Sequence, residues 1–435
     1  MTTTKNNEHK KLNVPNKQEQ NQTCWDSAER EGLRPKGNVP TLRFPEFQEE
    51  WDKCELGEFA TIIGGYAFKS ETLNSIGGKY QVVKMGNLYQ NQLDLHRSPS
   101  YTDTLTRKAE NVILRKDDIA ITLTGTNNKR DFGYTYIFND VKNLLLNQRC
   151  GLIRAKGNPY FLSCLLKTHT FLNQFFESAT GGTGNQANVS TKAMEMFSVN
   201  TPSLKEQEKI GQLMALLDER IATQSKIIED LKKLKSAIIE NHYNQTEKQT
   251  ASIADLGEPF SVGNLAKDDL TETGMPCVVY GELFTTYGET ISQIESHTNK
   301  TTGMILSKKG DLLFPSSTTV DAMSLIAPSV INVDGVILGG DMFGIHINHN
   351  YNAQYLSYYF NHIAKRQLAK FAKGSTIIHL HYADIEKAKL LLPSLEEQNR
   401  MAKCIMSLDA KINIENFFIS LLNSQKTHLL RQMFI

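Results

Sequence analysis

The 435-residue sequence lacks the features that mark membrane, secreted and strongly charged proteins. It contains no run of 18 apolar residues, and its first ten residues are polar throughout, so we expect a cytoplasmic protein with neither a membrane span nor a leader peptide. Lys and Arg number 48 against 47 Asp and Glu, so no excess of one charge indicates a polyanionic partner. About 40% of the residues are hydrophobic, which excludes disorder of the whole chain and predicts two or three folded domains.

Cysteine and histidine are too sparse and scattered to predict a disulfide framework or a metal centre. The six cysteines include no Cys-x-x-Cys pair, and none lies at zinc-like spacing from two histidines. We therefore expect reduced, half-buried cysteines, as in a cytosolic protein. His379 and His381 would lie on one face of a strand, but no third ligand is evident, so we predict no bound metal.

Catalytic signatures are missing as well. The sequence has no Asn-Pro-Pro motif of adenine methyltransferases, no Gly-x-Gly-x-x-Gly or Gly-x-x-x-x-Gly-Lys-Ser/Thr phosphate loop, no Gly-x-Ser-x-Gly elbow and no His-Glu-x-x-His helix. No pair of titratable residues stands out as an acid and a base. These independent absences predict a binding protein with no catalytic residues and no cofactor of its own.

An internal repeat organises most of the chain. Pro202-Ser-Leu-Lys-Glu-Gln207 recurs as Pro393-Ser-Leu-Glu-Glu-Gln398, and Leu217-Asp218 recurs as Leu408-Asp409, both at an offset of 191 residues. Weaker echoes follow upstream, in the same order and at slightly larger offsets. The sequence therefore predicts a tandem duplication of a unit of about 190 residues.

A long helix is predicted after each Pro-Ser-Leu motif. Apolar residues recur there at alternating steps of four and three for about four heptads, which is typical of a left-handed coiled coil. Polar residues interrupt both copies at the same two points, Gln224 and Glu415, and Lys235 and Lys426, where they can select a partner and a register. The seam consists of Ile210, Met214, Leu217, Ile221, Ile228, Leu231 and Ile238 in the first helix and of Met401, Ile405, Leu408, Ile412, Ile419, Leu422 and Leu429 in the second.

Two arrangements of these helices are compatible with the pattern. Each helix could pack on its own domain as an ordinary amphipathic helix. We favour antiparallel pairing of the two helices, because equivalent seams in a duplicated chain can pair about a pseudo-two-fold axis. Some 36 helical residues would then form a spacer of roughly 50 Å.

The modules before the helices read as mixed β structure with many loops, since short apolar runs alternate with glycine-containing and polar turns. Each module also contains one helix-like stretch, 160–176 and 353–371. The predicted fold class is α+β, with two tandem mixed α/β modules separated by two long antiparallel coiled-coil helices. The predicted organisation is a disordered polar tail over 1–38, a first module over 39–201, a first helix over 202–243, a linker and second module over 244–392, and a second helix over 393–435.

Several loops of these modules carry amide, hydroxyl and basic side chains, which suit phosphates and base edges. Each such loop could equally be a solvated turn. The candidate contact residues are Lys69, Ser70, Thr124, Thr126, Asn127, Lys129, Arg130, Asn185 and Gln186 in the first module and Ser316, Ser317, Thr318, Lys373, Ser375, His381 and Tyr382 in the second.

A set of motifs resembles one known family. They are Val39-Pro-x-Leu-Arg-Phe-Pro-x-Phe47, Gly65-x-Ala-Phe-Lys-Ser70, Leu146-Asn-Gln-Arg-x-Gly151, Gly339-Gly-Asp341 and the paired Pro-x-Leu-x-Glu-Gln helices. Together they are similar to the specificity subunit of type I restriction–modification enzymes, over roughly residues 39–435.

The resemblance implies a non-catalytic subunit that binds double-stranded DNA. Each target-recognition domain would read one half of a split, asymmetric sequence, and the helices would fix the gap. The subunit would dock two modification subunits, which use S-adenosylmethionine to methylate adenine N6, and restriction subunits, which use ATP and Mg²⁺ for translocation and cleavage. Two other classes remain open from the residues alone: a protein–protein scaffold without DNA contact, and an autonomous enzyme with an unrecognised site.

Overall fold

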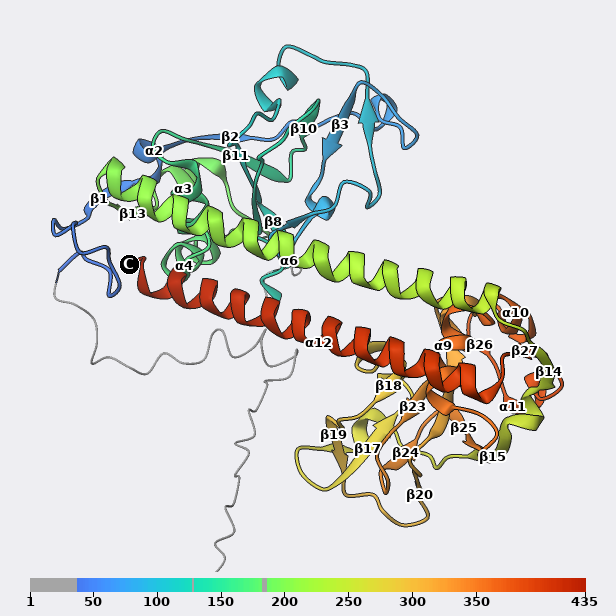
Figure 1. Cartoon of the computed structure of the whole chain (residues 1–435). Helices are drawn as coiled ribbons and strands as arrows, with labels where there is room; N and C mark the ends of the chain where they lie inside the picture. Colours follow the sequence, from blue (N-terminus) through green and yellow to red (C-terminus); the bar gives the residue numbers. More distant parts are fainter. Residues whose placement is uncertain (1–36, 127–128, 182–185) are drawn as a thin grey trace, which may run out of the picture. The chain divides into compact units, whose positions relative to one another are not determined.

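The computed structural model describes residues 37–126, 129–181 and 186–435. Nearly all of the tail expected over 1–38, and the candidate residues Asn127 and Asn185, lie outside the described residues. The chain forms two compact units (Figure 1). Unit 1 comprises Met1–Ala222 and Leu421–Ile435, and unit 2 comprises Thr223–Ser420.

The core of unit 1 is an antiparallel four-stranded sheet in the order β2-β11-β7-β9. Strand β7 is buried along its whole length, because its Ile-Ala-Ile-Thr run has apolar neighbours on both faces. A second sheet has the order β10-β3-β6, and two further pairs are β8 with β12 and β1 with β13. The strands are β1 (Asp52–Glu55), β2 (Ala60–Gly64), β3 (Tyr80–Val83), β4 (Leu88–Tyr89), β5 (Gln92–Leu93), β6 (Tyr101–Thr102), β7 (Ile119–Thr122), β8 (Thr124–Thr126), β9 (Thr135–Ile137), β10 (Leu144–Leu146), β11 (Cys150–Ala155), β12 (Gln186–Asn188) and β13 (Ser198–Thr201).

The short helices of unit 1 are α2 (Leu56–Phe59), α3 (Pro159–Leu165), α4 (His169–Glu177) and α5 (Thr191–Glu195). The prediction of one helix over 160–176 was wrong. The chain breaks after α3 because the Thr168 side chain accepts a hydrogen bond from the Phe171 backbone N–H and so caps the start of α4.

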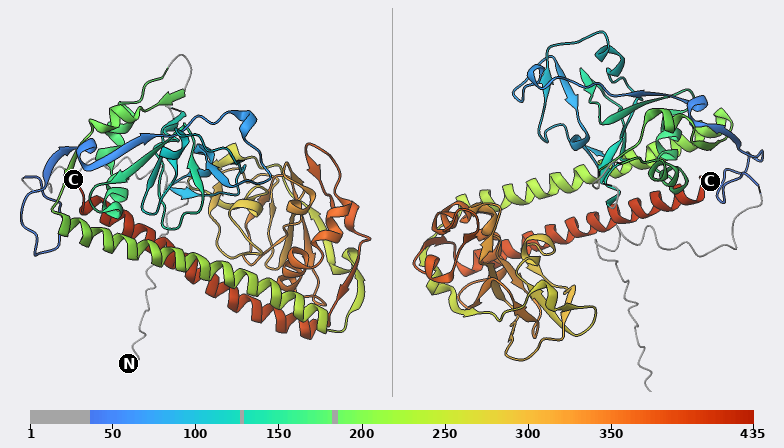
Figure 2. Two further views of the ribbon diagram at one scale, coloured as in Figure 1. Left: turned by 90° about the horizontal axis from the view of Figure 1, so that it is seen from above. Right: turned by 180° about the vertical axis from the view of Figure 1, so that it is seen from behind.

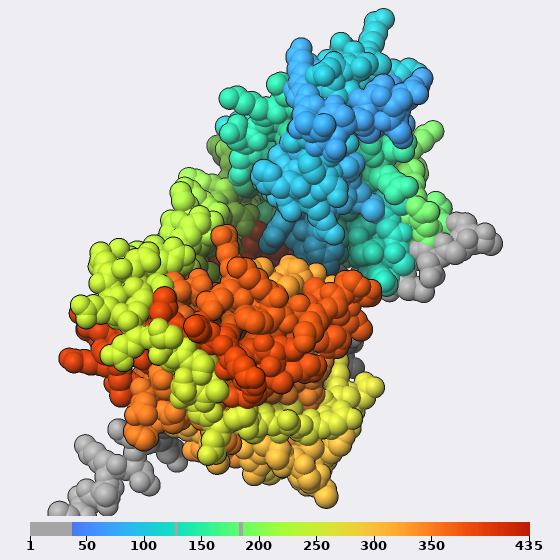
Figure 3. Space-filling model, turned by 90° about the vertical axis from the view of Figure 1, so that its right-hand side faces the viewer, coloured from blue at the N-terminus to red at the C-terminus, as the bar shows by residue number. Residues whose placement is uncertain are grey.

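Unit 2 is built on two five-stranded sheets, in the orders β15-β25-β21-β23-β18 and β16-β19-β17-β24-β20. Strand β22 pairs with β26, and β14 pairs with β27. On the face shown in Figure 3, the yellow-green segment that contains β14 lies on the orange-red residues of this unit. The strands are β14 (Gln249–Ser252), β15 (Gly257–Ser261), β16 (Leu270–Thr271), β17 (Met275–Val279), β18 (Thr290–Ile291), β19 (Ser296–Thr298), β20 (Ile305–Leu306), β21 (Asp311–Pro315), β22 (Ser317–Thr318), β23 (Ser329–Ile331), β24 (Ile337–Gly339), β25 (Met342–Ile347), β26 (Ile378–His379) and β27 (Lys389–Leu392).

The helices of unit 2 repeat the interruption seen in unit 1. The stretch expected as one helix over 353–371 is divided, since α9 ends at His362 and a short α10 follows. Strand β14 already begins at Gln249, so the linker expected from residue 244 is short. The helices are α7 (Glu282–Thr285), α8 (Ala322–Leu325), α9 (Ala353–His362), α10 (Lys365–Leu368) and α11 (Tyr382–Ile385).

Two long helices, α6 (Leu204–Gln245) and α12 (Leu395–Gln432), each contribute residues to both units. The repeated glutamine explains their common start. The side-chain amide of Gln207 donates to the Pro202 carbonyl at 2.8 Å, and that of Gln398 donates to the Pro393 carbonyl at 2.9 Å. Each glutamine thus ties the first turn of its helix to the proline that directly follows the preceding strand.

The two long helices run antiparallel within each unit (Figure 2), which confirms the predicted pairing. In unit 2 the Gln224 amide donates to Glu415, its own counterpart at the repeat offset of 191. Lys235 pairs with Asp409 in unit 2, and Lys426 pairs with Asp218 in unit 1. The same ion pair therefore recurs in each unit with the roles of the two helices exchanged, as the sequence repeat implies. All the seam positions are buried or half-buried.

The end of the chain completes unit 1. Met433 and Phe434 are buried in the same core cluster as Trp51 and Phe161, and the Phe434 ring stacks on that of Phe161 at 5.2 Å. Two seam residues of α6, Ile210 and Met214, belong to this cluster as well. The long helix therefore packs on its own module and on the other helix, so both arrangements considered from the sequence occur.

No helix among the described residues is long and apolar enough to cross a membrane. Of the described cysteines, Cys150, Cys164 and Cys277 are buried, Cys54 is half-buried and Cys404 is exposed, and all are free thiols.

Candidate nucleic-acid interface

Three candidate loops of unit 1 lie at one end of the β2-β11-β7-β9 sheet. Gly64, the last residue of β2, pairs with Gly151, and Thr122, the last residue of β7, pairs with Cys150, the first residue of β11. Because adjacent antiparallel strands run in opposite directions, the loop after β2, the loop before β11 and the segment after β7 meet at this end. Their described residues are 65–70, 147–149, 123–126 and 129–131.

Backbone hydrogen bonds fix these three loops to one another. The Gly65 N–H donates to the Cys150 carbonyl at 2.9 Å, and the Leu123 N–H donates to the Arg149 carbonyl at 2.9 Å. A Cβ atom at Gly65 would lie 2.0 Å from the Asn147 carbonyl oxygen, so only glycine permits this approach. The Gly65-to-Ser70 motif and the Leu146-to-Gly151 motif are thus in direct contact, with Gly65 packed on the backbone of the second motif.

The β8–β12 pair extends the same end of the sheet. The Thr124 hydroxyl donates to the Asn188 side-chain oxygen at 2.9 Å, and the Thr126 N–H donates to the Asp131 carboxylate. The Arg130 guanidinium lies 5.0 Å from the centre of the Phe176 ring, a cation–π distance that orients this cation. Lys129 is exposed beside it.

Unit 2 repeats the arrangement. Ser261, the last residue of β15, pairs with Phe343 near the start of β25, and Pro315 at the end of β21 pairs with Met342. The Gly340 N–H donates to the Gly263 carbonyl at 3.0 Å, and the Ser316 N–H donates to the Asp341 carbonyl at 2.7 Å. The Gly339-Gly-Asp341 motif therefore holds together the loops at the corresponding sheet end, where the β22–β26 pair follows.

A glycine turn presents the basic side chain of this second surface. Lys373 precedes Gly374, whose φ of +113° favours glycine. Lys373 pairs with Asp384, and this hydrogen bond lowers the pKa of the Asp384 carboxyl. Asp384 also accepts the His381 N–H at 3.0 Å. The charge of Lys373 is therefore partly offset by Asp384, although its side chain remains exposed.

The candidate residues differ in how far their side chains are exposed to solvent. The side chains of Ser316, Ser317 and Thr124 are buried, at 3%, 7% and 7% exposure, so they can contact DNA only after a local rearrangement. Thr126, Thr318 and Tyr382 are half-buried. The exposed candidates are Lys69, Ser70, Lys129, Arg130, Gln186, Lys373, Ser375 and His381.

The Asn147-Gln-Arg149 segment of the Leu146-to-Gly151 motif was also expected from the sequence to offer groups suited to base edges. Its residues Gln148 and Arg149 are exposed, just before β11, where the loops after β2 and β7 meet this segment. The rings of His379 and His381 stack with centroids 6.1 Å apart. Within the described ranges, no group of three or more His, Cys, Asp and Glu residues is placed to hold a metal ion.

A chain made of two copies of one loop-bearing unit, each leading into a long helix, is a modular recognition protein. The type I restriction modification DNA specificity domain matches residues 48–233 and 246–422. The chain belongs to this family and is a type I specificity subunit with two recognition domains, which confirms the resemblance found in its motifs.

Similar proteins cover the chain almost end to end. It is 21% identical over 408 residues to the putative type I restriction enzyme MjaX specificity subunit of Methanocaldococcus jannaschii, covering 87% of this chain and 91% of that protein. It is 23% identical over 402 residues to the MjaVIII specificity subunit of the same organism, covering 86% and 89%. The S subunit from M. genitalium has a similar fold, with a TM-score of 0.57 and 16% identity over 91% of this chain and 99% of that one.

Proposed function

We propose that each recognition domain reads one half of a split, asymmetric DNA target through the end of its central sheet. The observation that carries this proposal is that the same three-loop arrangement stands at the same sheet end in both units. In unit 1 the exposed Lys129, Arg130 and Arg149 suit phosphate contact, and Gln148 and Gln186 suit base edges. The loops differ in sequence between the units, so the two half-sites would differ.

We also propose that the subunit is not itself catalytic and acts in the cytoplasm, where it docks two modification subunits and the restriction subunits. The partners would supply S-adenosylmethionine, ATP and Mg²⁺, and this chain would bind no cofactor. Assembly is supported by a likeness in fold to a chain solved to explain complex assembly and conformational transition of the type I R-M system. That chain has a TM-score of 0.50 and 15% identity over 87% of this chain and 96% of its own length.

The docking surface we propose includes the outer face of α12. Met406, Ile414 and Phe417 are exposed at 47%, 61% and 44%. At about 100° per helical residue they fall within one narrow stripe on the side opposite the seam. An exposed apolar stripe on a helix that already has a partner on its other face is typical of a further protein contact.

Long-read sequencing of DNA from a methylation-free host tests this function. The host would carry the chain together with its modification subunit. We expect a bipartite motif with one N6-methyladenine on each strand. If the complex assembles and yet no motif is methylated, the DNA-recognition proposal is wrong and the scaffold alternative is favoured.

A further inference from the structure

A difference between the two units points to a second kind of site. In unit 2, Lys235 is buried and pairs with two carboxylates, Asp409 and Glu289, the latter at 2.9 Å. His362 lies 2.8 Å from Glu289, and the Tyr358 hydroxyl donates to Asp409 at 2.7 Å. Every charged group of this cluster thus has a partner inside the unit.

The corresponding place in unit 1 keeps only part of this cluster. Lys426 and Asp218 reproduce the Lys235–Asp409 pair. The helix N-caps Asn158 and Asn352 align the two modules, and the same alignment places Thr168 where unit 2 has His362. Next to β9, the chain carries three neutral amide side chains, Gln90, Asn91 and Gln92. The backbone N–H of Thr135, the first residue of β9, donates a hydrogen bond to the Asn91 side-chain oxygen at 2.8 Å. Unit 1 therefore has no carboxylate corresponding to Glu289.

Unit 1 also has an additional cation. Lys167 occupies the position that corresponds to Asn361, and its ammonium donates to the Ser163 hydroxyl at a long 3.4 Å. No carboxylate of the described residues lies within 4 Å of it. Burial lowers the pKa of Lys167, and the charge of nearby Lys426 acts in the same direction. Glu219 and Arg431 also line this place, so its three cationic side chains, with Lys167 and Lys426, exceed its two carboxylates, with Asp218, by one.

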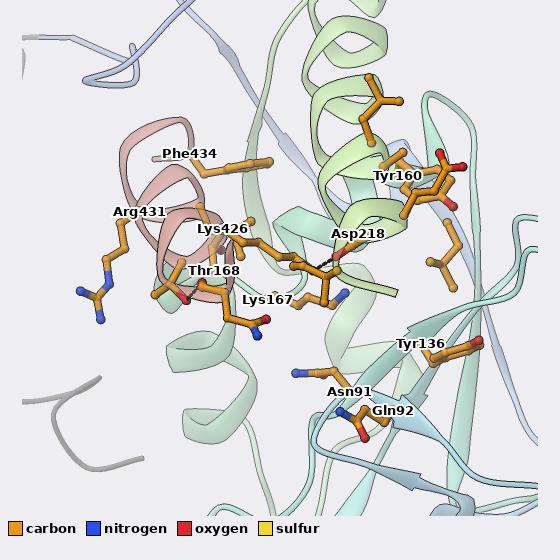
Figure 4. A pocket seen from close by; sticks show the side chains of 18 of the residues that line it. Asn91, Gln92, Tyr136, Tyr160, Lys167, Thr168, Asp218, Lys426, Arg431 and Phe434 are labelled. Atoms are coloured by element: carbon orange, nitrogen blue, oxygen red, sulfur yellow. Dashed lines mark hydrogen bonds and ion pairs between the residues drawn. The ribbon is translucent and has the colours of Figure 1, made fainter. Parts of the chain in front are cut away.

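These groups line an open pocket of about 1150 Å³. Figure 4 shows Lys167 and Lys426 entering it from different elements, with Asn91 and Gln92 across the pocket. Apolar side chains, among them Phe434, form part of the wall. None of the lining residues belongs to the candidate nucleic-acid interface. The pocket combines uncompensated positive charge, amide donors and room for a small molecule.

We propose that this pocket of unit 1 is a binding site for a small anion of the carboxylate or phosphate class. Lys167 and Lys426 would contact the anionic group, and the Asn91 and Gln92 amides would add neutral hydrogen bonds. A single bound anion would then balance the charge of the lysines in unit 1, as the Glu289 carboxylate pairs with Lys235 in unit 2. Charge-assisted hydrogen bonds of this kind are short and strong when water is partly excluded.

Calorimetric titration of the full-length protein with inorganic phosphate, and separately with succinate, tests this site. We expect saturable binding of one anion per chain. Lys167→Met should weaken it at least about tenfold, because a charge-assisted contact is lost. Gln92→Glu should weaken it as well, because the new carboxylate competes for the lysines. Lys53→Met, an exposed lysine of β1 outside the pocket, serves as the matched control and should bind like the wild type.

Thermal unfolding provides a second readout that does not depend on the size of the binding heat. Phosphate should raise the Tm of the wild type and of Lys53→Met but not that of Lys167→Met. Lys167→Met should fold, because it removes a poorly paired cation and keeps the length of the side chain. Absence of saturable binding to the wild type, or equal affinity in Lys167→Met, would overturn the proposal.

Discussion

Glu289 directly precedes β18 and links the module of unit 2 to helix α6 through an ion pair with Lys235. Burial alone would raise the pKa of this carboxyl, but the hydrogen bond with His362 and the charge of Lys235 lower it from 4.5 to about 2. The folded protein therefore holds the ionised form more strongly than the unfolded chain does. This stabilisation is fully present above pH 4.5 and is lost as the pH falls toward 2.

Glu289→Gln should remove this acid-sensitive part of the stability. At pH 7 we expect it to unfold about 3 kcal/mol more easily than the wild type, at roughly 1.4 kcal/mol for each unit of pKa difference. The difference should shrink between pH 4.5 and 2. Urea unfolding at a series of pH values measures this, with Glu272→Gln, an exposed glutamate of the same unit, as the control. Parallel pH curves for wild type and Glu289→Gln would contradict the assignment.

Lys129 and Arg130 are the exposed cations that follow the β8 strand of unit 1. Replacing both with alanine should weaken DNA binding to all sequences by a similar factor. It should also reduce the slope of the logarithm of the binding constant against the logarithm of the salt concentration, by an amount equivalent to up to about two phosphate contacts. Binding of the assembled complex to target and non-target DNA over a range of salt concentrations measures the slope. Lys205→Ala, an exposed lysine at the start of α6, should leave it unchanged. An unaltered slope in the double variant would show that this loop does not contact DNA.

At the scale of elements, the helix seam can be tested with adjacent residues. Leu217 is in the seam and nearly buried, whereas Leu216 is 57% exposed. Leu217→Asp should cost several kcal/mol, because a charge would be buried without a partner. Leu216→Asp should change stability little. Thermal unfolding of the two variants decides the matter, and equal destabilisation would mean that the seam has been misplaced.

The outer face of α12 makes a separate prediction. Phe417→Glu should weaken copurification with the modification subunit by at least tenfold, because a charge would replace an apolar contact, while the Tm of the free chain stays the same. Asn416→Glu is adjacent and exposed but lies outside the stripe, so it should assemble normally. Normal assembly of Phe417→Glu would move the docking surface elsewhere.

The elements that depend on local periodicity were predictable from the sequence, and those that depend on long-range pairing were not. The heptad steps and the twin Pro-Ser-Leu motifs located α6 and α12 to within a few residues. The break at Thr168 was missed because a single capping hydroxyl is a weak signal within an apolar stretch. Asp218 and Asp409 stood in the repeated Leu-Asp motif, yet nothing in the spacing identified Lys426 and Lys235 as their partners.

The candidate interface shows the same limit. Loop composition identified Lys69, Lys129 and Arg130, but the meeting of their loops depends on the register of β2, β7 and β11, which involves residues nearly 90 positions apart. Composition also could not show that Ser316 and Ser317 are buried. Their burial follows from the continuation of β21 into β22, whose pairing with β26 is a long-range contact.

At the scale of the whole molecule, we expect the length of the two long helices to set the number of base pairs between the two DNA half-sites. Deleting one heptad at equivalent positions, 225–231 and 416–422, keeps the seam in register and shortens each helix by about 10 Å. If the helices set the gap, the methylated motif should lose about three non-specific base pairs and keep both half-sites. Methylome sequencing reads the gap directly. An unchanged gap with intact methylation would contradict the spacer role.

Unit 1 includes residues 421–435, of which Phe434 and Met433 fill the core around Trp51 and Phe161. On the ribosome, all of unit 2, residues 223–420, emerges before these residues do. Unit 2 can therefore close while the recognition domain made first still exposes an apolar face. The order in which the two domains are synthesised and the order in which they are completed are thus reversed.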